Sequence, residues 1–415
     1  MKVLLVNTYD SGGAGTACVR LHNALLKHGV SSHLLTMHKT RTDIPFHYSY
    51  EDMSGAEPTN ILNRLNSLTI GNREIDTTTI KNISQSASQF TDVFSSIYSD
   101  CRIEDIPDIG SYDVINLHWT SRFLNWPSFF VSKIIKKVVW TLHDMAPFTG
   151  GYHYSNGFEG YKNDDALPHF LRQTAEPNLS KMLLAEKQAI LNASTIPVAI
   201  VSPSKWLLQC SQQSTLFNKK SHHHIFNCVP EEFKVSDSAT LASRVNITKG
   251  TKVILFVSDA KKSYRKGFHF IERLIDELPA SQFTFINVGG ELACHKSNVI
   301  NLGRIADQNE LAEAYILADR VVVPSLEDNS PNVVIESLVC GTPVVGFSIG
   351  GMTDFVTDNK CVYLSDDVSF QGLKKTLLDS LLSDASAVNN ESLTPARKRY
   401  SEDEQAKSYL EVFTE

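Results

Sequence analysis

The segment 324–351 carries three acidic residues, of which Asp328 and Glu336 lie eight positions apart. We expect an apolar strand, then a loop over residues 327–331, then a helix whose first backbone amides lack partners within the helix. Such a helix start can bind an anion or sugar hydroxyls, and carboxylates accept hydrogen bonds from paired hydroxyl groups. The pattern predicts a polar ligand at this loop, although Asp328 or Asn329 could instead serve only as the helix N-cap.

A basic turn follows the first apolar strand in the second half of the chain, in the sequence KKSYRKGF. Arg265 and Lys266 lie in this turn. Positively charged side chains at such a position can stabilise negative charge on a bound ligand. A solvated turn without a ligand is the alternative, but the position directly after a strand favours a functional interpretation.

Further candidates lie in the first half of the chain. The opening strand KVLLVN is followed by SGGAG, where Gly12 and Gly13 would let the backbone approach a ligand closely. The apolar segments YDVINLHW and KKVVWTLHD end near His118 and His143. Ligands of open α/β sheets bind beyond the carboxyl ends of the strands, so both histidines are candidates. A buried structural histidine is the alternative for His143.

The elements that must position these residues alternate along most of the chain. Short apolar runs, typical of strands buried on both faces, are separated by segments with helical periodicity. This pattern predicts an α/β protein with two doubly wound halves that join between residues 197 and 252. Residues 41–108 lose the alternation and suggest an insertion or acceptor-facing region, with two possible helices around 61–68 and 90–97. The C-terminal stretch 396–415 has an apolar stripe and predicts a packed helix, a solvated tail being the alternative.

Composition narrows the class of protein. The 415 residues are 42% hydrophobic and 20% charged, as in ordinary folded proteins, and the net charge of −7 gives no overall attraction for nucleic acid. No apolar run reaches the roughly 18 residues of a membrane-spanning helix, and the N-terminus shows no signal-peptide pattern. We therefore expect a cytoplasmic protein. The seven scattered cysteines contain no C-x-x-C pair, which predicts free thiols and no structural metal at cysteines.

The acidic segment, in the form PSLEDNSPNVVIESLVCGTPVV, resembles the E-x-seven-E region of retaining glycosyltransferases of family four (glycosyl transferases group 1). The basic turn resembles the Lys-Gly turn of that family, with Arg265 in place of its usual arginine. The segments INLHW and WTLHDMAPFTGGYHY resemble a polysaccharide-assembly branch, in which cysteines are common where this chain has Tyr152 and Phe158. The resemblance covers most of the chain and is weakest over 41–108.

This resemblance implies a GT-B fold, in which two Rossmann-like domains with parallel sheets face each other across a cleft. Residues 1–200 would form an acceptor-binding domain, completed by the helix 396–415 that crosses back to it. Residues 201–395 would form a domain that binds the nucleotide sugar.

The implied reaction is transfer of a sugar, with retention, from a UDP- or GDP-sugar to a glycan or lipid-linked saccharide in surface polysaccharide synthesis. Neither a metal nor another cofactor is expected, and contact with the inner membrane surface is plausible by family analogy. Implied catalytic residues are His143, Lys266 and Asp328, with either Asp328 or Glu327 contacting the donor sugar. Implied donor-binding residues are Gly13, Arg265, Lys266, Asp328, Asn329, Ser330, Pro331, Asn332, Val333 and Glu336. Implied acceptor-side residues are Gly12, Gly13, His118, His143, Asp144 and Tyr152.

Three other functions compete with this interpretation. A dehydrogenase would also use Rossmann-like halves, but neither half shows G-x-G-x-x-G after a strand with an acid about 20 residues onward. A catalytically silent protein that binds sugar nucleotides would keep the same donor pocket. A GT-B epimerase would isomerise the donor without an acceptor. The sequence assigns neither the donor sugar nor an oligomeric state.

Overall fold

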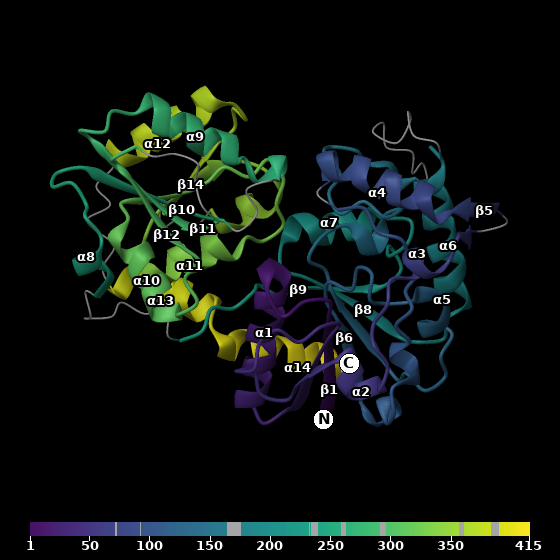
Figure 1. Ribbon diagram of the computed structural model, residues 1–415. Coiled ribbons are helices and arrows are strands. Elements are labelled where there is room, and N and C mark those ends of the chain that lie inside the picture. The colour runs from purple at the N-terminus through teal and green to yellow at the C-terminus, as the bar shows by residue number, and fades with distance from the viewer. Residues whose placement is uncertain are drawn as a thin grey trace. The chain divides into compact units, whose positions relative to one another are not determined.

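The computed structural model describes residues 1–70, 73–91, 93–163, 176–231, 233, 240–258, 263–290, 296–356, 361–382 and 390–415. These residues form two compact units (Figure 1). The first unit comprises Met1–Ile225 and the last residues of the chain, Gln405–Glu415. The second unit comprises Phe226–Glu404.

A parallel seven-stranded sheet forms the centre of the first unit, in the order β3-β2-β1-β6-β7-β8-β9. The strands are β1 (Lys2–Asn7), β2 (Ser31–Thr36), β3 (His47–Ser49), β6 (Val114–Leu117), β7 (Val138–Thr141), β8 (Val198–Ser202) and β9 (Ser221–His224). The chain moves outward in one direction from β1 to β3 and in the other from β6 to β9. The carboxyl ends of β1 and β6 therefore form the switch point at which such sheets bind ligands.

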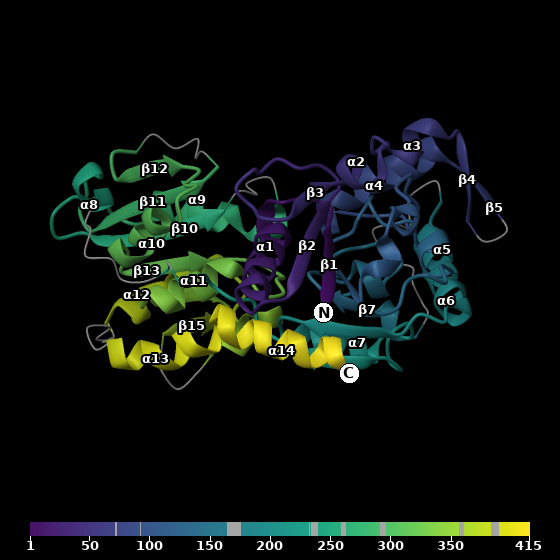
Figure 2. The same cartoon turned by 90° about the horizontal axis from the view of Figure 1, so that it is seen from below.

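The helices of the first unit include the last helix of the chain. They are α1 (Gly12–Lys27), α2 (Tyr50–Ser54), α3 (Ile61–Arg64), α4 (Thr77–Thr91), α5 (Trp126–Phe129), α6 (Leu179–Ala193), α7 (Lys205–Gln213) and α14 (Glu402–Thr414). On α14, Ala406, Tyr409, Val412 and Phe413 are buried in one apolar cluster with side chains of α1 and the sheet. Figure 2 shows α14 beside α1. The predicted return of the C-terminal helix to the first half of the chain is confirmed.

The segment 41–108 is more structured than its sequence suggests. Its described residues include β3, the α-helices α2, α3 and α4, and an antiparallel hairpin of β4 (Ser67–Ile70) and β5 (Arg73–Asp76). The helix expected around 61–68 ends at Arg64, and the helix expected around 90–97 is wrong, because α4 ends at Thr91. Phe94 instead forms a bridge with Tyr152 and is buried in the apolar core. This contact is distant in sequence, so local periodicity does not reveal it.

The second unit is built on a parallel six-stranded sheet in the order β12-β11-β10-β13-β14-β15. The strands are β10 (Lys252–Ser258), β11 (Phe283–Gly289), β12 (Val299–Gly303), β13 (Arg320–Val323), β14 (Val344–Phe347) and β15 (Val362–Ser365). The helices are α8 (Thr240–Arg244), α9 (Phe268–Glu277), α10 (Gln308–Leu317), α11 (Asn332–Cys340), α12 (Phe370–Leu382) and α13 (Asn390–Arg399). The switch point of this sheet lies between β10 and β13.

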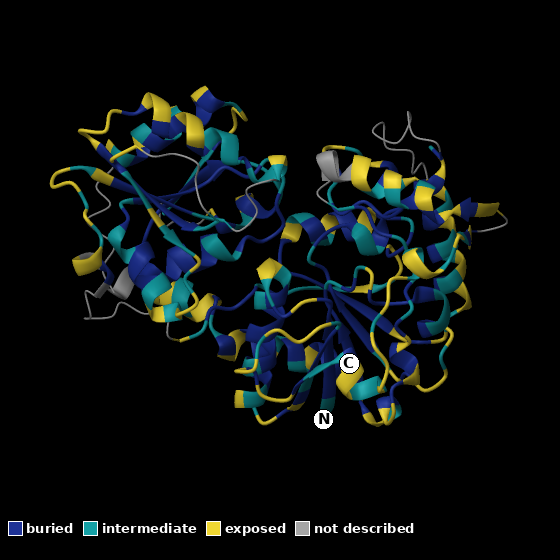
Figure 3. Ribbon diagram, viewed as in Figure 1, coloured by how far each residue is buried: buried dark blue, intermediate teal, exposed yellow. Residues whose placement is uncertain are grey.

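Alternating side chains of β10 pack on opposite faces of the second sheet. Val253 and Leu255 join a cluster with α10 and α11, whereas Ile254 and Phe256 join a cluster with α9 and α12. Side chains of a strand alternate between the faces of a sheet, so both faces must be covered. The central strands are accordingly buried (Figure 3). These two sheets confirm the predicted α/β architecture of the GT-B type.

The borders between the units differ from the expected positions. The expected border at 200/201 falls inside β8, and β9 still belongs to the first sheet. Near the C-terminus, α13 and Tyr400 belong to the second unit, and the residues that return to the first unit begin at Gln405. Two helices, rather than one, therefore occupy the end of the chain.

No described helix combines the length and the apolar character needed to cross a membrane. The cysteines in the described part of the chain are free thiols, as predicted: Cys18, Cys101, Cys210, Cys228, Cys340 and Cys361. Cys294 lies outside the described residues.

Candidate active site

The switch point of the second unit brings together the basic turn and the acidic loop. Arg265 and Lys266 lie in a short helical turn, η6 (Tyr264–Lys266), that follows β10, and Asp328 lies in the loop that follows β13. Lys266 Nζ donates to Asp328 Oδ2 at 2.7 Å, and Arg265 Nη1 lies 3.7 Å from the same oxygen. Two motifs that are separate in the sequence thus form one charged cluster.

Asp328 is an ionised, buried carboxylate within this cluster. Its residue is 5% exposed, its Oδ2 also accepts from Ser325 Oγ, and its Oδ1 accepts from the amide of Asn329. Burial raises the pKa of Asp328, but the charges of Lys266 and Arg265 and these hydrogen bonds outweigh burial and hold it below the ordinary value. The carboxylate is therefore suited to orient Lys266.

Two glycines allow the surrounding loops to approach closely. Gly267 has a φ of +69°, and a Cβ atom there would lie 1.8 Å from the carbonyl oxygen of Pro324. Gly350 has a φ of +48°, and its Cβ would lie 2.3 Å from the carbonyl oxygen of Asp328. That oxygen accepts a hydrogen bond from the amide of Gly351 at 3.0 Å. Only residues without a side chain fit these positions, so backbone packing fixes the loop that carries Asp328.

The start of α11 lies beside this cluster. Pro331 is its N-cap residue and makes no side-chain capping bond, so the interpretation of Asp328 or Asn329 as a simple N-cap is wrong. Ser330 is 9% exposed, and its hydroxyl has no hydrogen-bond partner among the described residues. Asn332 Oδ1 accepts from Asn227 Nδ2 at 3.2 Å. A buried hydroxyl without a partner beside a helix N-terminus is suited to bind a phosphate or a hydroxyl group.

Glu336 lies within α11, in its second turn, and is buried. The phenol of Tyr315, on α10, donates to Glu336 Oε2 at 2.7 Å. Val333 is partly buried and packs against the apolar cluster below the helix. The structure thus gathers the donor-side candidates of the second unit around one strand end and one helix start.

The glycine turn of the first unit follows β1. Gly12 and Gly13 are exposed at the start of α1, whose N-cap residue, Ser11, makes no side-chain capping bond. A Cβ atom at either glycine would meet no other heavy atom within 4 Å. At Gly15, in contrast, a Cβ would lie 2.8 Å from the carbonyl oxygen of Tyr9. Gly15 therefore serves close packing, whereas Gly12 and Gly13 leave open space at the helix start.

His118 and His143 meet at the carboxyl ends of β6 and β7. His118 Nδ1 lies 2.9 Å from His143 Nε2, and His118 Nε2 lies 3.0 Å from Asn116 Oδ1. Burial lowers the pKa of His118 well below its ordinary value. Burial also lowers the pKa of His143, to about 4, although the charge of Asp144 opposes this shift. Both rings are therefore neutral near pH 7.

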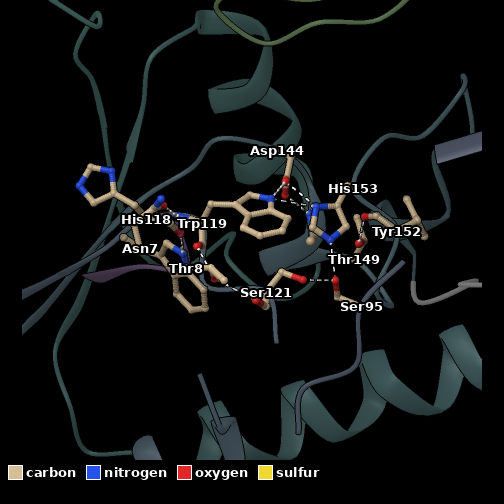
Figure 4. Close-up of polar contacts among 12 residues, drawn as sticks. Asn7, Thr8, Ser95, His118, Trp119, Ser121, Asp144, Thr149, Tyr152 and His153 are labelled. Carbon is tan, nitrogen blue, oxygen red and sulfur yellow. Dashed lines mark hydrogen bonds and ion pairs between the residues drawn. The ribbon is translucent and has the colours of Figure 1, made fainter. Parts of the chain in front are cut away.

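Asp144 belongs to a network of polar contacts that joins the loop after β7 to Trp119 and Ser95 (Figure 4). Asp144 Oδ2 lies 2.7 Å from Trp119 Nε1 and 2.5 Å from His153 Nδ1, and its Oδ1 accepts from the amide of Ala146. Burial raises the pKa of Asp144, but His153 and the hydrogen bonds outweigh burial and hold the pKa below its ordinary value. His153 Nε2 also contacts Ser95 Oγ at 2.8 Å. This network fixes the indole of Trp119 at the end of β6.

Tyr152 is separated from solvent. It is fully buried in the apolar core of the first unit, with its ring 5.9 Å from that of Phe158. The structure therefore brings together His118, His143 and Asp144, which line one pocket. Tyr152 does not line this pocket and is a packing residue of the core.

Two side chains that contact this loop, His153 and Lys187, were not predicted as site residues from the sequence. His153 follows Asp144 by nine positions in the same loop, and this closeness in sequence is the signal that could have identified it. Lys187, on α6, is 3% exposed, and its Nζ donates to the carbonyl oxygens of Ala146 and Thr149 at 2.5 and 2.8 Å. Burial lowers the pKa of Lys187 to about 7. No local pattern distinguishes this lysine from the exposed lysines of an amphipathic helix.

Comparisons with known proteins support the GT-B fold and the resemblance to glycosyl transferases group 1. Residues 251–382 match the family Glycosyl transferases group 1. The D-inositol 3-phosphate glycosyltransferase of Thermobispora bispora is 26% identical over 275 residues, which cover 60% of this chain and 58% of that protein. A protein of the same name from Corynebacterium jeikeium is 26% identical over 297 residues, covering 65% and 63%. The chain thus spans less than two thirds of either relative.

Solved structures match over the whole chain. Anabaena HepE in complex with UDP and glucose is 16% identical with a TM-score of 0.64, covering 100% of this chain and 99% of that one. The sucrose-phosphate synthase from Thermosynechococcus elongatus is 15% identical with a TM-score of 0.64, covering 100% and 98%. Identities this low show the fold alone. The chain therefore has the GT-B glycosyltransferase fold over its whole length and matches the group 1 glycosyltransferases in the sequence of its second unit.

Proposed function

We propose that this chain is a retaining glycosyltransferase that moves a sugar from a UDP- or GDP-sugar to a glycan or lipid-linked saccharide. The observation that carries the proposal is the cluster of Lys266, Arg265 and Asp328 beside the start of α11. It lies at the switch point of the segment that matches group 1 glycosyltransferases. The UDP complex of a protein with the same fold makes UDP the first nucleotide to test.

On the donor side, the second unit offers groups that match the diphosphate, the sugar and the ribose of a nucleotide diphosphate sugar. Lys266 and Arg265 neutralise the diphosphate as it departs, which makes a metal ion unnecessary. Ser330 and the start of α11 bind phosphate or sugar oxygens. Glu336 accepts hydrogen bonds from the ribose hydroxyls while Tyr315 holds its other oxygen.

On the acceptor side, the first unit contributes Gly12, Gly13, His118, His143 and Asp144. In the proposed reaction the bond from the sugar C1 to the phosphate oxygen breaks. A bond from C1 to the acceptor oxygen forms on the same face, and the departing phosphate takes the proton of the acceptor hydroxyl. This route retains the anomeric configuration without a protein nucleophile.

The proposed setting is surface polysaccharide synthesis in the cytoplasm, with contact to the inner membrane surface. Two relatives are named for D-inositol 3-phosphate, so a phosphorylated polyol is an alternative acceptor class to a glycan. The acceptor screen below therefore includes both.

The test combines ligand binding and turnover. UDP, GDP and their sugars are screened for a rise in the melting temperature, since ligands that bind the folded state stabilise it. Mass spectrometry then follows transfer from the stabilising donor to oligosaccharides, lipid-linked saccharides and D-inositol 3-phosphate, with and without EDTA. Lys266→Ala is expected to lower transfer by about 100-fold or more. Lys375→Ala is the control, because the Lys375 side chain is 81% exposed and lies on α12.

Other outcomes would indicate a different function or refute part of the proposal. Binding of a sugar nucleotide without turnover on any acceptor would indicate a silent binding protein. Isomerisation of the donor alone would indicate an epimerase. Full transfer by Lys266→Ala would refute the assigned donor site, and loss of transfer with EDTA would refute the metal-free mechanism.

A further inference from the structure

A chain of buried side chains in the first unit leads to His143. Tyr409 on α14 lies 2.9 Å from Thr141 Oγ1 through its phenol oxygen, and Thr141 Oγ1 lies 3.0 Å from Asn116 Nδ2. Asn116 in turn contacts His118, which contacts His143. Each link has one donor and one acceptor, so the direction of one bond constrains the next.

The hydrogen bond made by the side-chain nitrogen of Asn116 fixes the orientation of its amide group. Asn116 Nδ2 lies 2.9 Å from the backbone carbonyl oxygen of Val139, which can only accept. The amide oxygen of Asn116 must therefore face His118 Nε2, at 3.0 Å. The flipped amide would place two oxygen atoms against each other at the Val139 carbonyl. It would also leave a buried acceptor unsatisfied, at a cost of about 1–3 kcal/mol.

The proton of His118 follows from this orientation. An amide oxygen can only accept, so His118 Nε2 carries a hydrogen and donates it. His118 is buried and neutral, because burial holds its pKa well below the ordinary value. A neutral imidazole has one protonated nitrogen, so His118 Nδ1 carries a lone pair and accepts.

The hydrogen bond from His143 to His118 fixes the proton of His143 in the same way. Its Nε2 lies 2.9 Å from the accepting Nδ1 of His118 and must donate. We propose that Asn116 and His118 are positioning residues that hold neutral His143 in the tautomer with its proton on Nε2. The Nδ1 atom of His143 is then an acceptor, so any group that bonds to it, in the protein or on a sugar, must donate.

The consequence for the reaction rests on the proposed function. In this tautomer His143 cannot give a proton from Nδ1 to a substrate, so it cannot be a general acid there. It can accept a hydrogen bond from a sugar hydroxyl. Asn116 and His118 would thus define what His143 offers without touching a substrate themselves.

The tautomer can be measured without donor or acceptor. The histidine rings are labelled with ¹⁵N, and NMR at pH 7 correlates the carbon-bound ring protons with the ring nitrogens. The signals that disappear in His143→Gln are assigned to His143. We expect a protonated-type nitrogen at Nε2 and an unprotonated-type nitrogen at Nδ1 of His143. A protonated Nδ1 would overturn the proposal.

Variants separate positioning from packing. Asn116→Leu and His118→Phe should each abolish the preference, giving His143 nitrogen signals that average both tautomers, and either variant suffices if the other does not fold. Tyr409→Phe is the matched control, because Asn116 Nδ2 keeps the Val139 carbonyl and the tautomer should persist. An unchanged tautomer in folded Asn116→Leu would refute the positioning role. Full transfer by His143→Gln would instead remove His143 from the proposed reaction while leaving the tautomer result intact.

Discussion

Lys266 Nζ lies 2.7 Å from Asp328 Oδ2, and this ion pair joins the loops that follow β10 and β13. Asp328 and its neighbour Glu327 differ in surroundings. Asp328 is buried with hydrogen bonds to both carboxylate oxygens, whereas Glu327 is partly exposed and its backbone oxygen accepts from Arg265 Nη1. The side chain of Asp328 therefore braces the donor side from a buried position, whereas Glu327 is more exposed to solvent.

Asp328→Asn should destabilise the second unit more than Glu327→Gln does. Loss of the buried carboxylate weakens the hydrogen bond to Lys266 and leaves the positive charge of Lys266 uncompensated. This change should lower the free energy of unfolding by about 2 kcal/mol. The Lys266 side chain is 29% exposed and can turn to solvent, which limits this loss. Urea denaturation and the KM for the donor are measured for both variants. Equal destabilisation by the two substitutions would contradict the assigned roles.

Gly267→Ala should damage the donor site through the backbone. An added Cβ would lie 1.8 Å from the Pro324 carbonyl oxygen, so the loops after β10 and β13 would have to separate. Gly250→Ala is the matched control, since Gly250 has a φ of +85° but its Cβ would meet nothing within 4 Å. In Gly250→Ala, backbone strain alone should lower the free energy of unfolding by about 1–2 kcal/mol. Gly267→Ala should lose more and should also fail to bind the donor, and an equal loss in the two variants would argue against the clash.

The sequence predicted the two sheets and the donor cluster for the same reason. Lys266 and Asp328 each follow an apolar run long enough to be a buried strand, and neighbouring strands of a doubly wound sheet end on the same side. Local patterns therefore carry that part of the site.

Other parts depend on contacts that are distant in sequence. Phe94 ends up opposite Tyr152, and Lys187 reaches the loop after β7 from a helix more than 30 positions later. Neither contact leaves a periodic signal. The edge strand β9, with its run SHHH, lacks the apolar pattern of the central strands, so the border of the first unit was placed too early.

Deleting residues 405–415 should unfold the first unit. Tyr409, Val412 and Phe413 are nearly fully buried against α1 and the sheet. Each large apolar side chain contributes roughly 1.5–3 kcal/mol, so their combined loss is comparable to the 5–15 kcal/mol total stability of a typical domain. Deleting only residues 414–415, which are exposed, is the control. Calorimetry should show the loss of a transition in the longer deletion, and two intact transitions there would refute the packing role of α14.

Acidification should destabilise the first unit through histidines buried in neutral form. Burial lowers the pKa of His22 to about 4, although its hydrogen bond to the Pro45 carbonyl opposes this shift, and the pKa of His143 is likewise about 4. In the unfolded chain histidine takes up a proton near pH 6.5. Between pH about 6.5 and 4 the unfolded state therefore binds protons that the folded state does not. The free energy of unfolding consequently decreases as the pH is lowered through this range.

The His22 contribution can be isolated. His22 is fully buried between Ser32 Oγ and the Pro45 carbonyl, and its shift corresponds to roughly 3 kcal/mol lost on going from pH 7 to pH 4. Urea denaturation at pH 7, 6 and 5 measures the slope for the wild type, His22→Gln and the exposed control His38→Gln. His22→Gln should be less stable at pH 7 but should lose less stability on acidification, because it removes one proton-binding group from the unfolded state. An unchanged slope in His22→Gln, or a reduced slope in His38→Gln, would show that buried His22 is not a source of the acid sensitivity.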